Sequence, residues 1–145
     1  MNGKKIALSL ILALLLVASL CACAPADNSQ KSVVIIIGER EFALNTQAAF
    51  LHDALLELKE TGEIEVYSFS GSGTGIYIDE LSGLDASAQN SFIGVYHNID
   101  DATLIDYQYG GSQTVGGETF RSSNVGVAAL PLVDGAKYLL TVSTF

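Results

Sequence analysis

The sequence predicts an α+β fold in which one main helix covers a mixed sheet. A β-branched, apolar run from Ser32 to Ile37 is followed by a Gly-Glu turn and by alternation from Arg40 to Leu44, which is the pattern of a β-hairpin. Apolar residues then recur at helical spacing from about Gln47 to Glu60, and the rest of the chain returns to strand patterns. A hairpin, a helix that crosses it and a return to strands is the order of a β-grasp.

The helix is expected to begin near Gln47, because Asn45 and Thr46 offer side-chain oxygens as N-caps. Gly62 is expected to end it. Its apolar positions lie on one face, with charged residues between them: Leu51, Ala54, Leu55 and Leu58.

Further strands are expected after the helix, at residues 63–69, 76–81, 91–98, 104–109 and 137–143. Two glycine-rich stretches, 71–75 and 110–117, are interpreted as a turn and a mobile loop. The first begins like a phosphate-binding G-x-G motif. Strand-forming residues follow it, however, so no helix dipole would meet a phosphate there.

The amino terminus has the pattern of a bacterial lipoprotein signal peptide. Two lysines precede an apolar run from Ile6 to Leu20, which is shorter than the ~20 residues that a membrane-spanning helix needs. The run ends in Leu20-Cys21-Ala22-Cys23, which matches a lipobox and predicts lipidation of Cys23. Cys21 fits less well because bulky Leu20 directly precedes it. A plain secretory signal, cleaved after Ala22 or Ala24, is the alternative.

We therefore expect three regions: a signal peptide at 1–22, a lipidated cysteine and flexible tether at 23–32, and one domain at 33–145. Cleavage removes Cys21, and lipid blocks Cys23, the one cysteine that the mature chain keeps, so no disulfide is expected. Cleavage removes two of the seven basic residues and none of the sixteen acidic ones, which changes the net charge from −9 to −11. Such an acidic chain, with no basic stripe, is unsuited to nucleic acid.

Three stretches of the domain resemble the transcobalamin C-terminal-like domain family, in the order in which that family has them. Thr74 to Gly83 (TGIYIDELSG) resembles its G-x-Y-I-x-x-I-x-G signature. Ser91 to Asn98 (SFIGVYHN) lies where the family has an aromatic strand, and Leu132 to Leu140 (LVDGAKYLL) resembles its closing segment. With the hairpin and helix before them, the similarity covers nearly the whole domain.

The chain departs from the family pattern at several positions. It has no tryptophan, and Phe92, Gly94 and Tyr96 occupy the stretch where the family has tryptophans. Ile99 replaces the glycine after the strand asparagine, and Ala136 replaces the second aspartate of D-G-D.

The resemblance implies a binding module rather than an enzyme. The family occurs in Gram-positive lipoproteins and in animal cobalamin carriers, where it covers one face of a corrinoid. Together with the lipobox, the resemblance implies a surface lipoprotein, anchored by lipid at the outer face of the plasma membrane, that binds cobalamin or another small molecule. The ligand-facing residues are expected to be Tyr77, Phe92, Tyr96 and Asn98.

The alternative is a surface module that contacts a protein or glycan and binds no small molecule. Such a module would use an exposed sheet edge, expected at Val33–Ile37 or at the closing strand.

The remaining candidate residues are interpreted as structural. His97 and His52 are not at the spacing of a metal pair, and each is taken as an ordinary imidazole. Asp100, Asp101 and Asp106 lack the spacing of a calcium loop and are taken as a solvated acidic turn. No nucleophile or metal motif is recognisable, so we expect neither enzymatic activity nor a metal site.

Overall fold

The computed structural model describes residues 29–73, 75–108 and 110–144. The expected signal peptide, Cys23 and residues 24–28 of the tether lie outside this part of the chain. Within the described residues, no helix has the length and apolar character needed to cross a membrane.

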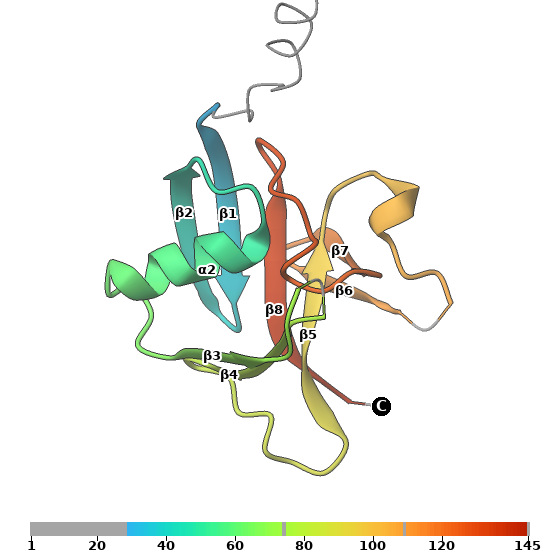
Figure 1. Cartoon of the computed structure of the whole chain (residues 1–145). Coiled ribbons are helices and arrows are strands. Elements are labelled where there is room, and N and C mark those ends of the chain that lie inside the picture. The colour runs from blue at the N-terminus through green and yellow to red at the C-terminus, as the bar shows by residue number, and fades with distance from the viewer. Residues whose placement is uncertain (1–28, 74, 109, 145) are drawn as a thin grey trace, which may run out of the picture.

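The described chain is an α+β fold with a six-stranded mixed sheet, a two-stranded sheet and a main helix (Figure 1). This confirms the expected class. The elements in chain order are β1 (Lys31–Ile37), β2 (Arg40–Thr46), α2 (Leu51–Glu60), β3 (Tyr67–Ser70), β4 (Tyr77–Leu81), β5 (Ser91–His97), the 3-10 turn η2 (Ala102–Leu104), β6 (Ser112–Val115), β7 (Glu118–Ser122) and β8 (Lys137–Thr144).

The strand order of the large sheet is β2-β1-β8-β5-β7-β6. β1 and β8 pair in parallel, from Val34 opposite Lys137 to Ile37 opposite Leu140, and the other neighbours are antiparallel. The strands that were expected as exposed edges, Val33–Ile37 and the closing strand, therefore lie in the interior of the sheet, and that prediction is wrong. β8 pairs with the side of β1 that β2 leaves open, so β1 is an interior strand. The edges of the sheet are β2 and β6.

Each face of the large sheet buries a different set of residues. On one face the odd-numbered residues of β1 pack with the predicted apolar positions of α2, and β3 and β4 add Tyr67 and Leu81 to the same core. In Figure 1 the helix crosses in front of β1 and β2. On the opposite face a smaller cluster joins four central strands: Ile36, Tyr96, Phe120 and Leu139.

α2 begins at Leu51, four residues later than expected, because Thr46 remains in β2. The Thr46 hydroxyl accepts a hydrogen bond from the Ala48 N–H at 2.9 Å and donates one to Glu57 Oε2 at 2.6 Å. The first helical N–H groups, of Leu51 and His52, donate to the carbonyls of Leu130 and Val127, each at 3.0 Å. A distant segment therefore caps the helix, in place of the side-chain cap that local sequence predicts.

Two local predictions after β5 are wrong. Residues 112–122 form the hairpin β6–β7 rather than a loop, with Gly116 (φ 60°) and Gly117 (φ 82°) at its turn. Both glycines adopt the positive φ that a tight hairpin turn needs, so the Gly-Gly pair was the available signal. Of the expected strand at 104–109, the described residues 104–108 do not form a strand: η2 ends at Leu104, and Ile105 makes an isolated bridge to Ser123.

Candidate ligand-binding site

Phe92 and Tyr96 project from β5 on the face opposite the helix, as their pairing with Ser143 and Leu139 requires. Tyr96 is only 6% exposed, and its hydroxyl lies 2.8 Å from Ser143 Oγ. Phe92 is 37% exposed. Tyr96 thus belongs to the second hydrophobic cluster, with its polar end satisfied within the sheet.

Asn98 follows β5 and extends its pairing with β8 by one residue. Its backbone N–H donates to the Lys137 carbonyl at 3.2 Å, and its Oδ1 accepts from the Lys137 N–H at 2.8 Å. Its Nδ2 donates to Glu118 Oε1 at 2.7 Å. Both polar atoms of the Asn98 side chain are therefore engaged with the protein.

Glu118 also forms an ion pair with Lys137, with 2.6 Å between Oε2 and Nζ. Hydrogen bonds from Lys137 and Asn98 hold the pKa of Glu118 below its usual value, and the same carboxylate raises the pKa of Lys137. This charged cluster ties β5, β7 and β8 together at one end of the sheet.

Tyr77 lies on β4, in the small sheet, and is 72% exposed. It lines a cavity of about 160 Å³ between β4, β5 and residues 126–127, where most of the lining side chains are aliphatic. The lining residues are Gly75, Ile76, Tyr77, Ile78, Ile93, Val95, Gly126 and Val127.

The structure separates Tyr77 from the other three expected ligand residues. β5 contributes Ile93 and Val95 to the cavity beside Tyr77, and these alternate with Phe92 and Tyr96 on the other face of the same strand. Sequence reasoning missed Ile93 and Val95, although their alternation with the aromatics was visible. It had no signal for residues 126–127, which reach the cavity only through the tertiary fold.

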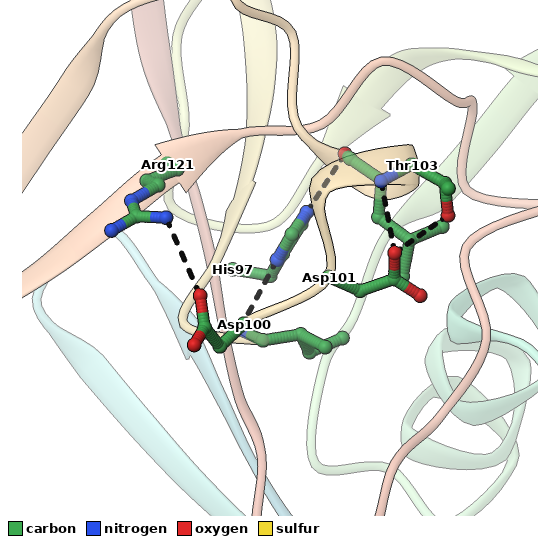
Figure 2. Close-up of polar contacts among 7 residues, drawn as sticks. His97, Asp100, Asp101, Thr103 and Arg121 are labelled. Atoms are coloured by element: carbon green, nitrogen blue, oxygen red, sulfur yellow. Dashed lines mark hydrogen bonds and ion pairs between the residues drawn. The ribbon is translucent and has the colours of Figure 1, made fainter.

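His97 is buried and uses both ring nitrogens within the protein (Figure 2). Nδ1 accepts a hydrogen bond from the Ile99 N–H at 3.2 Å, so Nε2 carries the proton that it donates to the Leu104 carbonyl at 3.0 Å. This arrangement leaves neither nitrogen for a metal ion, and it anchors the turn after β5.

The neighbouring aspartates stabilise turns. Asp101 Oδ1 accepts from the backbone N–H and the hydroxyl of Thr103, at 2.9 and 2.7 Å, and these bonds lower the pKa of Asp101 (Figure 2). Asp100 forms an exposed 3.7 Å ion pair with Arg121, and Asp106 accepts from the Gln108 N–H at 2.9 Å. Within the described ranges, no group of three or more His, Cys, Asp or Glu residues is placed to hold a metal ion.

His52 and Tyr67 form a second polar contact, between α2 and β3. Burial, with a smaller contribution from Asp53, raises the pKa of Tyr67, so its hydroxyl stays protonated. The Tyr67 hydroxyl shares a hydrogen bond with His52 Nδ1, with 2.6 Å between the oxygen and the nitrogen. The His52 ring also meets Phe69 edge-on, with centroids 4.6 Å apart. The contact is explained by packing between the helix and the small sheet.

Comparison with known proteins identifies the fold alone. No protein-family model matches the chain, and no curated protein matches its sequence. A crystal structure of a candidate metal-binding protein from Ruminococcus gnavus ATCC 29149 is similar, with a TM-score of 0.50 and 16% identity. The likeness covers 81% of this chain and 98% of that one. At this identity it indicates a shared arrangement of strands and helix and carries no information on ligands.

Proposed function

We propose that this chain is a lipoprotein held at the outer face of the plasma membrane through Cys23, with a β-grasp domain that binds a small molecule beside Tyr77. The β-grasp assignment is supported by the parallel pairing of β1 with the last strand and by the helix that crosses the first hairpin. The resemblance to transcobalamin C-terminal-like domains suggests a corrinoid as the ligand.

The observation that carries the binding proposal is an exposed tyrosine beside a cavity lined mostly by aliphatic side chains. Tyr77 is mostly exposed to water, while half-buried Ile76, just before β4, and half-buried Ile78, on β4, flank it. A cavity of about 160 Å³ is smaller than the ~300–1,000 Å³ of sites that enclose a whole ligand. A corrinoid would therefore insert one substituent and leave most of its surface outside, so its affinity should be far below that of two-domain carriers.

Calorimetric titration of the full chain in detergent with cobalamin and cobinamide tests this site. Tyr77→Ala should abolish or strongly weaken saturable binding. Tyr107→Ala is the matched control, because Tyr107 is 71% exposed and does not line the cavity. If neither corrinoid produces heat on titration, or if the Tyr77→Ala and Tyr107→Ala variants bind equally well, the proposal of a corrinoid site beside Tyr77 is wrong.

Anchoring is tested separately by the two cysteines of the lipobox. Cys23→Ala should release the chain from membranes and stop incorporation of labelled palmitate, whereas Cys21→Ala should leave both unchanged. If Cys23→Ala still incorporates lipid, the assignment of the lipidated residue is wrong.

A second candidate function is an interaction module without a small-molecule ligand. The observation that favours it is the free edge of β2, since β1 is the only neighbour of β2 in the sheet that the structure describes. Failure of corrinoids to bind, with the lipid anchor intact, would favour this function.

A further inference from the structure

β2 presents a row of outward-facing backbone groups along one edge of the large sheet. The two-residue turn at Gly38–Glu39 makes Ile37 and Arg40 a hydrogen-bonded pair, so the N–H and C=O groups of Glu41, Ala43 and Asn45 point away from β1. All three residues are exposed, and their backbone groups have no hydrogen-bond partner recorded among the described residues. Such an edge is a template for an added strand.

The other edge of the sheet is a poorer template. β6 spans only Ser112–Val115, while β2 spans seven residues from Arg40 to Thr46 and alternates exposed positions with Phe42, Leu44 and Thr46. β2 therefore offers both a longer row of backbone groups and an apolar side to an incoming segment.

The end of α2 creates a groove along this edge. In Figure 1 the C-terminal end of the helix extends past β2. A cavity of about 340 Å³ lies between residues 41–45 of β2 and residues 57–63, with Phe42, Leu44 and Leu58 among its lining. A strand added to β2 would place every second side chain in this groove.

The wall of the groove is acidic. Glu57 and Glu63 line it, and Asp53 and Glu60 continue the acidic surface along the helix toward Asn45 and Thr46. The carbonyl end of the helix adds partial negative charge at the same place.

The cations around the groove are engaged with backbone carbonyls and not with these acids. Lys31 donates to the Ala48 carbonyl at 3.2 Å, Arg40 to that of Glu63 at 3.0 Å and Lys59 to that of Tyr67 at 3.1 Å. The two ion pairs recorded in the described part of the chain, Arg121–Asp100 and Lys137–Glu118, both lie elsewhere.

We propose that the edge of β2 docks an extended, basic peptide segment of another protein as an additional strand. Outward groups at Glu41, Ala43 and Asn45 would pair with its backbone, and its lysine or arginine side chains would face Glu57, Glu60 and Glu63. A second copy of this chain fits poorly, because pairing β2 with β2 would bring two acidic grooves together. The inference is independent of the Tyr77 cavity, so either can fail without the other.

The test uses the full chain in detergent and two short blocked peptides, one of alternating lysine and valine and one of alternating glutamate and valine. Binding is measured by fluorescence anisotropy at low and high salt. The lysine peptide should bind saturably and lose affinity with salt, and the glutamate peptide should not bind.

Two proline variants locate the docking edge. Ala43→Pro removes an outward N–H of β2 without removing a bond to β1, and it should weaken lysine-peptide binding about tenfold or more. Thr114→Pro is the matched control on β6, where the Gly116–Gly117 turn makes the Thr114 N–H point outward in the same way. Equal melting temperatures of the two variants and the parent chain show that folding is retained.

A charge exchange completes the test. The double variant Glu60→Lys/Glu63→Lys should weaken binding of the lysine peptide more than the control Glu80→Lys/Asp100→Lys. The control makes the same change in net charge, and Glu80 and Asp100 do not line the groove or the acidic surface beside it. The proposal is overturned if the lysine peptide does not bind or if both peptides bind alike. It is also overturned if the two proline variants, or the two charge variants, have equal effects.

Discussion

The ring of Tyr96 lies over Gly94, which precedes it by two residues on β5. A Cβ atom at Gly94 would lie 2.8 Å from Tyr96 Cε2 and 2.5 Å from Ser143 Oγ, distances that real Cβ atoms do not tolerate. The glycine therefore allows the tyrosine ring to reach across the strand and meet Ser143 on β8. The small size of Gly94 is therefore required for the contact between Tyr96 and Ser143.

Gly94→Ala should destabilise the fold by about 1–3 kcal/mol, because the added methyl group must displace Tyr96 or Ser143. Gly111→Ala is the control, since no atom lies within 4 Å of the position that its methyl group would take. The free energy of unfolding, from urea denaturation, checks the difference. Equal effects of the two substitutions would contradict the tight approach at Gly94.

Tyr96→Phe should lower the free energy of unfolding by about 0.5–1.5 kcal/mol, because it leaves Ser143 without its partner. Ser143→Ala should have a similar effect, and the double variant should lose less than the two single losses added. A thermodynamic cycle of the three variants measures this coupling. Strict additivity would show that the hydroxyl pair does not contribute to stability.

Tyr138 should make the fold sensitive to strongly alkaline pH. Its hydroxyl is buried, accepts from the Val133 N–H and donates to the Pro131 carbonyl, both at 2.8 Å, and burial raises its pKa from 10.0 to about 12. Because the folded pKa is the higher one, this stabilisation is complete below pH 10 and is lost as the pH rises toward 12. The loss should be on the order of 2–3 kcal/mol.

Unfolding free energies of the parent chain and of Tyr138→Phe, measured from pH 8 to 12, check this expectation. The phenylalanine variant lacks the two hydrogen bonds and starts less stable, but its stability should fall less steeply with pH. Parallel curves for the two proteins would contradict the assignment of the effect to Tyr138.

Glu118 should contribute to stability at neutral pH but not in acid. Its pKa is lowered by Lys137 and Asn98, so its stabilisation is present above the ordinary glutamate value of 4.5 and is lost as the pH falls through the lower folded value. Glu118→Gln should therefore be slightly less stable than the parent at pH 7 and equally stable in strong acid. The effect is small because both side chains of the ion pair are partly exposed.

Glu39→Gln, at the exposed β1–β2 turn, is the control for the loss of one negative charge. Thermal unfolding at a series of pH values gives the comparison. A difference between Glu118→Gln and the parent that persists undiminished in acid would show that its cause is not the carboxylate charge.

Periodicity in the sequence was enough to predict the elements whose apolar residues repeat regularly. The first hairpin, the apolar face Leu51, Ala54, Leu55 and Leu58, and the strands that begin at Ser91 and Lys137 were all expected and are present. The signal was sufficient because burial on one face leaves a period of 3.6 residues in a helix and of two in a strand. The β6–β7 hairpin was missed although its Gly-Gly turn was visible, since its strands are short and mostly polar.

Tertiary structure alone decided which faces and edges these elements present. Alternation shows that Phe92 and Tyr96 share one side of β5 while Ile93 and Val95 share the other, but not which side the helix covers. Insertion of β8 between β1 and β5 made the expected edge an interior strand, and the carbonyls of Val127 and Leu130 set the first turn of α2. The strand order and the cap of α2 depend on backbone hydrogen bonds between segments that are distant in sequence. Because nearly every residue carries the same backbone N–H and C=O groups, the local sequence does not indicate which segments will pair.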